Sequence, residues 1–165
     1  MIRVATSADA EAIAAIYNYY ITDTIVTFEE VPLAGSEIAA RIEDVRAAGL
    51  PWTVVDVDGL VTGYAYASGW KKRIGYRFSV ESTVYLSPAA TGKGLGTALY
   101  ADLIERLSGR GLHLVIGGIG LPNPASVALH ERMGFEKVAH FKEVGQKFGK
   151  WIDVGYWQRT LRSGE

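Results

Sequence analysis

The stretch of this 165-residue sequence whose residue types could do chemistry is TVYLSPAATGKGLGTALYADL, residues 83–103. A β-type run ends at Pro88, three glycines follow at alternate positions from Gly92, and an apolar helical pattern begins among them. The first backbone N–H groups of a helix lack acceptors within it, and the positive end of the helix dipole attracts anions. Glycines let the backbone approach such an anion closely because they have no Cβ. The stretch therefore predicts a site for a phosphate group.

Two common nucleotide-binding loops do not fit this stretch. A P-loop needs lysine directly after its second conserved glycine, and here Leu95 follows Gly94. A dinucleotide-binding loop follows the first strand of its unit. GKGLGT instead follows the third β-type run of the chain and ends at Thr97. Both nucleotide-binding interpretations therefore fail.

A second group of polar residues lies in LPNPASVALHERMGF, residues 121–135. Asn123, Ser126 and His130 are spaced by three and four residues, so a helix would carry them on one face. Asn123-Pro124 is a strong helix start, because Asn caps a helix well and Pro suits its first position. His130 has a purely structural alternative, in which a neighbouring carbonyl satisfies its ring.

The composition indicates one folded domain, residues 1–165, that can position these residues. Hydrophobic residues make up 48% and charged residues 21% of the chain, which is typical of globular proteins. The formal net charge of -1 gives no reason to expect nucleic acid as a partner. No segment approaches the roughly 20 apolar residues of a membrane span, and the N-terminus lacks the apolar core of a signal peptide. The absence of cysteine excludes disulfides, thiolate metal sites and a cysteine acyl-enzyme. We expect a soluble, cytoplasmic protein.

Hydrophobic periodicity predicts an α/β domain without internal repeats. The expected helices cover about residues 7–20, 36–48, 95–107 and 124–133. The expected β-type segments are an extended run over 24–33, a hairpin over 52–70 around Asp58-Gly59, and runs over 78–86, 112–121, 137–144 and 151–160. The run over 112–121 is almost continuously apolar, as expected of a strand covered on both faces.

The loop from Thr91 to Gly96 resembles the pyrophosphate loop of the GNAT acetyltransferases, Arg/Gln-x-x-Gly-x-Gly/Ala, with Thr91 in place of the usual Arg or Gln. The helical segment before Gly134-Phe135 also resembles the matching segment of that superfamily. The resemblance implies a mixed, mostly antiparallel central sheet that is flanked by helices and splayed at an acetyl-CoA site. It implies acetyl-CoA as co-substrate and no metal.

Further segments resemble the phosphinothricin and methionine sulfoximine N-acetyltransferases, a group that includes enzymes acting on arsinothricin. They follow one another in the family's order over almost the whole chain: IYNYY, TFEE, PW, GYAYASGW, VESTVYLSP, GLGTALY, LPNPASVALHE, GF and GKWIDVGYW. The resemblance implies direct acetyl transfer to the α-amine of a glutamate-like antimetabolite. Phe148 stands where the tail motif commonly has His, which leaves the shape of the acceptor pocket open.

The resemblance also implies which residues hold acetyl-CoA. Backbone N–H groups from Gly92 to Thr97 would bind the diphosphate, with a charge contributed by Lys93. The main chain from Val84 to Leu86 would contact the thioester and the pantetheine arm. Asn123 would contact the same arm. The complete implied set is Val84, Tyr85, Leu86, Gly92, Lys93, Gly94, Leu95, Gly96, Thr97, Asn123 and Ser126.

Two residues of this chain match catalytic positions of the family. Glu81 matches the Glu of VEST and is the expected base, because an α-amino group with a pKa of about 8 must lose a proton before it attacks. The alternative is a strand glutamate that points to solvent. His130 is the second expected catalytic residue; it would return a proton to the coenzyme A thiolate or act as a base near the amine, and its structural alternative stays open.

The acceptor pocket is implied by WKKRIGYRF and TFEE. Arg forks suit carboxylate and phosphinate groups, and the family pattern W-x-x-R-x-x-Y falls on Arg73 and Tyr76. Together with Phe28 and Arg77 these are the expected substrate-binding residues, whereas Lys71 and Lys72 suit a solvated loop. In the tail, Trp151, Tyr156 and Trp157 are expected to serve packing or an interface, in keeping with the homodimers usual in the family.

Two alternatives remain at this stage. The same fold could acetylate another amine, such as a peptide N-terminus or a polyamine, although the basic segment before Glu81 would repel a polyamine. The chain could also be a coenzyme A-binding protein without catalysis, against which the presence of both Glu81 and His130 argues.

Overall fold

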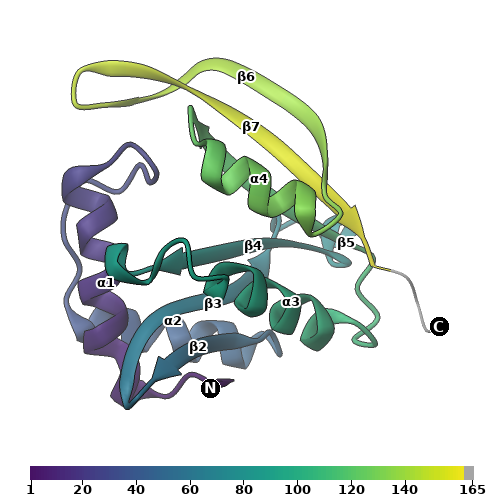
Figure 1. Cartoon of the computed structure of the whole chain (residues 1–165). Coiled ribbons are helices and arrows are strands. Elements are labelled where there is room, and N and C mark those ends of the chain that lie inside the picture. Colours follow the sequence, from purple (N-terminus) through teal and green to yellow (C-terminus); the bar gives the residue numbers. More distant parts are fainter. Residues whose placement is uncertain (162–165) are drawn as a thin grey trace.

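A seven-stranded sheet in the order β1-β2-β3-β4-β5-β7-β6 runs through the computed structural model, which describes residues 1–161 (Figure 1). The strands are β1 Ile2–Val4, β2 Trp52–Val57, β3 Leu60–Gly69, β4 Ser79–Leu86, β5 Leu114–Leu121, β6 Glu136–Lys147 and β7 Lys150–Thr160. Every neighbouring pair is antiparallel except β4 and β5, which are parallel. The mixed, mostly antiparallel sheet expected from the sequence is thus confirmed.

Helices cover both faces of this sheet. They are α1 Ala10–Asp23, α2 Gly35–Ala47, α3 Leu95–Leu107 and α4 Pro124–Arg132, with short 3-10 turns at Ser7–Asp9, Ile74–Tyr76 and Pro88–Ala90. The apolar sides of α1 and α2 form one core with β2 and β3, and those of α3 and α4 form a second core on the opposite face. In Figure 1, α3 and α4 lie on the viewer's side of the sheet and α2 lies behind it. Within residues 1–161, no helix is both long and apolar enough to cross a membrane.

Alternation along β4 sends neighbouring side chains to different cores. Val80 is buried in the core with α3, and the Ser82 hydroxyl lies 2.5 Å from the hydroxyl of Tyr100 on α3. Tyr85 instead packs at 5.2 Å, between ring centroids, against Tyr17 of α1. Because Glu81 shares the face of Tyr85, its carboxylate lies on the α1 and α2 side of the sheet.

The sheet divides between β4 and β5. These strands pair only from Ser79–Leu114 to Glu81–Ile116. Beyond that point β4 stays paired with β3 as far as Leu86, and β5 stays paired with β7 as far as Leu121. The two inner edges are therefore free of strand partners beyond Glu81 and Ile116, which is the expected splay.

Most predicted elements are confirmed, with ends that shift by a few residues. The hairpin turn falls at Asp58-Gly59, where both residues have positive φ. Two differences stand out. The segment over residues 24–33 joins no strand and bends at residues 25, 26 and 31, and β1 was not expected because three residues are too few to show a periodic pattern. The strand β5 is covered on both faces except at Gly118, which is exposed.

Candidate active site

The glycine-rich loop forms an anion cradle at the start of α3. Gly92 and Gly94 have φ of 74° and 78°, a left-handed conformation that glycine adopts without strain, and Gly94 is the N-cap of the helix. The N–H groups of Leu95, Gly96 and Thr97 lie in the first turn, where a helix offers them no acceptor. The exposed Lys93 flanks them. This geometry suits a diphosphate group.

The side chains of Thr91 and Arg132 lie beside the cradle. Its hydroxyl donates to the carbonyl of Pro88 at 2.8 Å, so it stabilises the turn before the loop. A guanidinium reaches the cradle from another element, because Arg132 of α4 donates to the Thr97 hydroxyl at 3.4 Å. Lys93 and Arg132 therefore place two positive charges beside the cradle, although Thr91 itself carries none.

The main chain of β4 borders the gap between the two halves of the sheet. Phe78 O accepts from His113 N at 2.8 Å, so by alternation the N–H and C=O of Val84 also face the β5 side. There they have no strand partner, since pairing with β5 stops at Glu81. The backbone N–H and C=O of Tyr85 face β3, and the carbonyl of Leu86 accepts from the Tyr20 hydroxyl at 2.6 Å. By the same alternation the N–H of Leu86 also faces the β5 side, so Val84 offers both backbone groups to the gap and Leu86 its N–H.

The Glu81 carboxylate lies where β4 and β5 part. It is half-buried, and burial raises its pKa. A Cβ built on Gly118 of β5 would lie 3.4 Å from Glu81 Oε1 and 3.1 Å from Tyr156 Cε1, so carboxylate and phenol border the same exposed glycine. A carboxylate with a raised pKa beside an opening in the sheet can take a proton from a ligand there.

His130 lies on the opposite face of β5. It is buried, and its Nδ1 lies 2.8 Å from the carbonyl of Ser126, so Nδ1 carries the ring proton. Its Nε2 faces Gly117, and the ring packs edge-on against Tyr100 and Phe135. Burial lowers the pKa of His130. Because side chains at Gly117 and Gly118 would point to opposite faces, the sheet separates His130 from Glu81.

The other two polar residues of α4 serve the helix itself. The side-chain oxygen of Asn123 accepts from Ser126 N at 3.1 Å and so caps α4. The Ser126 hydroxyl lies 3.4 Å from His130 Nδ1. The expected common face of Asn123, Ser126 and His130 is therefore formed, and the amide nitrogen of Asn123 stays available for a ligand.

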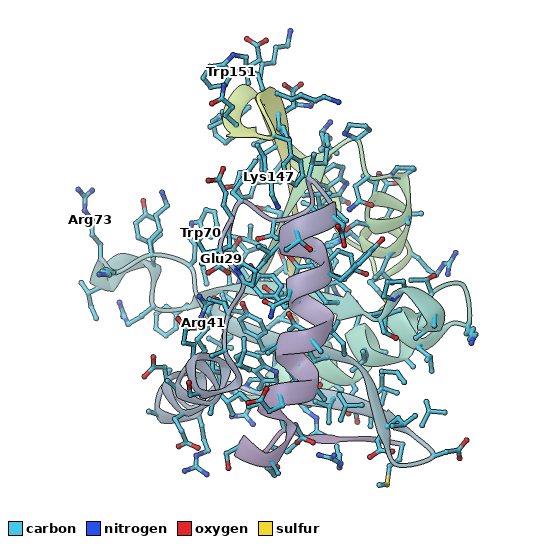
Figure 2. All side chains as sticks on the ribbon, turned by 90° about the vertical axis from the view of Figure 1, so that its left-hand side faces the viewer. Glu29, Arg41, Trp70, Arg73, Lys147 and Trp151 are labelled. Atoms are coloured by element: carbon cyan, nitrogen blue, oxygen red, sulfur yellow. The ribbon has the colours of Figure 1, made fainter. Side chains whose placement is uncertain are left out.

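A charged network on the face of Glu81 had only the TFEE motif as its sequence signal. Arg41 of α2 binds Glu29 through two hydrogen bonds of 3.0 and 2.5 Å, and the Tyr17 hydroxyl also donates to Glu29. Tyr66 of β3 lies among these groups, with its pKa raised chiefly by burial and further by the charges of Glu81 and Glu29. Glu29 and Arg41, which form this ion pair, are labelled in Figure 2.

Of the expected acceptor-binding residues, the two aromatic ones pack against the body of the molecule and the two arginines do not face the Glu81 carboxylate. The Phe28 ring lies against Gly145 of β6, and Tyr76 joins Trp70, Phe141 and Tyr156 around a hollow of about 410 Å³. The Arg73 side chain points away from the body of the molecule (Figure 2). Arg77 donates to the carbonyl of Ile74 at 3.1 Å and stacks on Phe78. Neither arginine is directed at the Glu81 carboxylate.

The tail motif forms the β6–β7 hairpin. Phe148 lies in its turn with a φ of 51°, and both Phe148 and Trp151 are more than half exposed. Trp157 is buried in the core with α3, whereas Tyr156 faces Glu81. The expected packing role therefore fits Trp157, and Tyr156 belongs to the site.

Comparison with known proteins agrees with this geometry. Residues 2–155 match the family described as Acetyltransferase (GNAT) domain. The chain is 41% identical to a phosphinothricin N-acetyltransferase of Alcaligenes faecalis, over 99% of this chain and 84% of that protein. It is 38% identical to an L-methionine sulfoximine/L-methionine sulfone acetyltransferase of Salmonella typhimurium, over 97% and 94%.

Two solved structures are similar over nearly their full length. An acetyltransferase from Salmonella typhimurium, determined with its cofactor acetyl-CoA, has a TM-score of 0.96 at 36% identity and covers 100% of this chain and 95% of its own. A ribosomal-protein-alanine N-acetyltransferase from Brucella melitensis has a TM-score of 0.95 at 38% identity, with 98% and 99% covered.

Proposed function

The chain belongs to the GNAT acetyltransferase family, and on that premise we propose that it acetylates the α-amine of a glutamate-like amino acid, of the phosphinothricin, methionine sulfoximine or arsinothricin type. The names of its relatives support this acceptor class. The observation that carries the proposal is the Glu81 carboxylate, half-buried and with a raised pKa, at the point where the sheet opens. Such a transfer would protect a cell from the antimetabolite.

Acetyl-CoA fits the residues on the other side of that opening. The first-turn N–H groups of α3 would bind its diphosphate, with Lys93 and Arg132 adding positive charge. Val84 would offer its free backbone groups to the thioester and the pantetheine arm, and Asn123 its amide nitrogen. When bound, acetyl-CoA supplies the activated acetyl group.

The chain's own chemistry is proton transfer and polarisation. Glu81 accepts a proton from the acceptor's ammonium group, and burial raises its pKa, which makes it a stronger base than an exposed glutamate. The Val84 N–H polarises the carbonyl that the amine attacks. We propose that His130 is structural, because its protonated nitrogen is bonded to Ser126 and the sheet lies between it and Glu81. Ser126 supports it.

Recognition of the acceptor falls to the face of Glu81. Phe28 and Tyr76 would form apolar walls, and the Glu29–Arg41 pair would fix the loop that carries Phe28. Arg73 and Arg77 contribute only where the 70–78 loop turns toward Glu81, since both point elsewhere in this structure.

We further propose that the protein acts as a homodimer in the cytoplasm. Large apolar side chains that are more than half exposed follow one another along the β6–β7 hairpin: Val138, Phe141, Val144, Phe148 and Trp151. Exposed large apolar side chains gathered on one hairpin support an interface. Light scattering after size exclusion should give twice the chain mass of 17.9 kDa, and a single-chain mass would contradict the dimer.

A peptide N-terminus is the second candidate acceptor. The similarity to the ribosomal-protein-alanine N-acetyltransferase favours it, because identity and coverage match those of the amino-acid enzymes. A polyamine has no such support, and a coenzyme A-binding protein without catalysis would have no use for a half-buried carboxylate at the opening.

Release of free thiol from acetyl-CoA tests the proposal. The acceptors to compare by kcat/KM are phosphinothricin, methionine sulfoximine, arsinothricin, ordinary amino acids, an alanine-initiated peptide and spermidine. We expect the glutamate-like analogues to lead. Preference for the peptide would support the second candidate. If none of these acceptors causes the release of thiol, the proposed function is refuted.

A further inference from the structure

Lys147, at the end of β6, is the most deeply buried charged side chain among the described residues. It is 1% exposed, and its ammonium group donates to the carbonyls of Thr27 at 2.7 Å and Tyr20 at 3.3 Å. Within residues 1–161 it takes part in no ion pair. Burial of a charge is costly unless hydrogen bonds and favourable dipoles compensate it. Here the compensation comes from main-chain carbonyls at the C-terminal end of α1 and just beyond, where a helix dipole favours a cation.

These two bonds join parts of the molecule that the sheet leaves separate. Lys147 belongs to the β6–β7 hairpin, which is paired with β5. Tyr20 lies in the last turns of α1, which packs on β3 and β4, and Thr27 lies in the segment that follows. Since β4 and β5 part after Glu81, the Lys147 bonds connect the two halves of the sheet at the open end of the gap. Figure 1 shows the hairpin tip reaching over α1, and Figure 2 shows Lys147 directed toward it.

The segment after α1 also borders the acceptor side of the site. A Cβ on Gly120 of β5 would lie 3.2 Å from the carbonyl of Ile25, so the segment runs directly along the strand. Its residue Phe28 packs its ring against Gly145 of the hairpin. Glu29 is held from the other side by Arg41 and Tyr17. The position of Phe28 therefore depends on contacts from both halves of the sheet.

We propose that Lys147 is a positioning residue that ties the β6–β7 hairpin to residues 20–27 and thereby sets the acceptor side of the site. The ammonium group fits this role because it donates several hydrogen bonds from one small centre. Burial lowers the pKa of Lys147, in agreement with its enclosed position. Acetyl-CoA is held by the loop before α3, so the effect of Lys147 is directed at the acceptor alone. The kinetic part of this inference rests on the proposed function.

The test compares Lys147→Met and Lys147→Arg with the wild-type protein. Lys150→Met is the matched control, since Lys150 lies in the same hairpin and is exposed. Hydrogen exchange of residues 20–30 is measured on the ligand-free full chain, together with the KM for phosphinothricin and the Kd for acetyl-CoA. We expect Lys147→Met to speed this exchange and to raise the acceptor KM by about tenfold, because small misplacements of positioning groups are costly. The Kd for acetyl-CoA should stay within about twofold, and Lys147→Arg should recover part of the loss because it keeps a charged donor.

The proposal is overturned if Lys147→Met and Lys150→Met show the same hydrogen exchange of residues 20–30 and the same KM for phosphinothricin. An equal weakening of acetyl-CoA binding would also overturn it, because the damage would then be general. Should Lys147→Met fail to fold, the wild-type protein is labelled with an amine-reactive reagent instead. Lys147 must then react far more slowly than Lys150, and equal rates would refute the bonds between the hairpin and residues 20–27. The exchange measurement needs no acceptor, so a protein inactive on every amine would refute the proposed function without touching this result.

Discussion

Two neighbouring glycines of β5 test which face of the sheet carries the chemistry. A Cβ added to Gly117 would fall well inside contact distance of the buried His130 ring. A Cβ added to Gly118 would lie 3.1 Å from Tyr156 and 3.4 Å from the Glu81 carboxylate. Neither glycine has positive φ, so alanine fits the backbone at both positions and the added methyl is the only perturbation.

The two methyl groups should have different consequences. The His130 ring cannot yield easily, because it is bonded to Ser126 and packed between Tyr100 and Phe135. Overpacking a core costs about 1–3 kcal/mol. At about 2–4 °C per kcal/mol for a domain of this size, Gly117→Ala should lower the Tm by roughly 2–12 °C.

Gly118→Ala should act on the rate instead. The exposed site lets Tyr156 and Glu81 move by a few tenths of an ångström, so the Tm should change by less than about 2 °C. A displaced base loses its alignment with the amine, for which a loss of about 10- to 100-fold in kcat/KM is expected, or about 1.4–2.7 kcal/mol in the barrier.

The assay is a thermal unfolding curve and kcat/KM per folded molecule for each variant. Gly69→Ala is the control, since a Cβ there meets nothing within 4 Å. The opposite result, in which Gly117→Ala keeps its Tm and loses more activity than Gly118→Ala, would refute the separation of Glu81 and His130 by the sheet. It would also restore His130 as a catalytic residue.

Three further predictions follow from the site and the fold. Because burial raises the pKa of Glu81, kcat/KM of the wild-type enzyme should rise with pH through a limb above the ordinary glutamate range near 4.5. Glu81→Gln should abolish this pH dependence and lower kcat/KM by about 10²–10⁴ while acetyl-CoA binding persists. Glu105→Gln, on the exposed side of α3, should keep the pH dependence and the wild-type kcat/KM. A fully active Glu81→Gln enzyme would contradict the assignment. Arg3 holds the pKa of Asp9 at about 2, below its ordinary 3.8, so this carboxylate stabilises the fold above that range and the benefit is lost as pH falls toward 2. The Tm difference between the wild-type protein and Asp9→Asn should therefore shrink from pH 5 to pH 2, and a constant difference would contradict the pair. Gly94→Ala should cost about 1 kcal/mol of stability, because alanine is strained at a φ of 78°, and should weaken acetyl-CoA binding in a calorimetric titration; unchanged binding would argue against the cradle.

The parts predicted from the sequence are those fixed by neighbouring residues. The cradle follows from glycine conformation and the start of one helix, so the spacing of Gly92 and Gly94 was enough to locate it. The hairpin followed from Asp58-Gly59, and the common face of Asn123, Ser126 and His130 followed from helical periodicity. Each of these features needs only one element, and no knowledge of what packs against it.

The parts that could not be predicted depend on pairs distant in the sequence. Tyr156 reaches Glu81 because β7 pairs with β5 in a register that places Tyr156 opposite Gly118. No sequence pattern singles out Lys147, and its burial is evident only in the fold, where the hairpin reaches over α1. The resemblance to the family pattern makes Arg73 an expected substrate ligand, and only the fold shows its side chain directed outward.

The separation of the two faces also bears on how transfer can occur. The cradle lies at the start of α3, on one side of the sheet, while Glu81 lies on the side of α1 and α2. Between residues 1 and 161, β4 and β5 lose their pairing beyond Glu81, and that gap joins the two sides at the carboxylate itself. An acetyl group held from the α3 side can meet an amine from the α1 side only through this gap. Direct transfer between two bound substrates is therefore the mechanism that the sheet geometry favours, and a chain without cysteine has no thiol to hold the acetyl group in between.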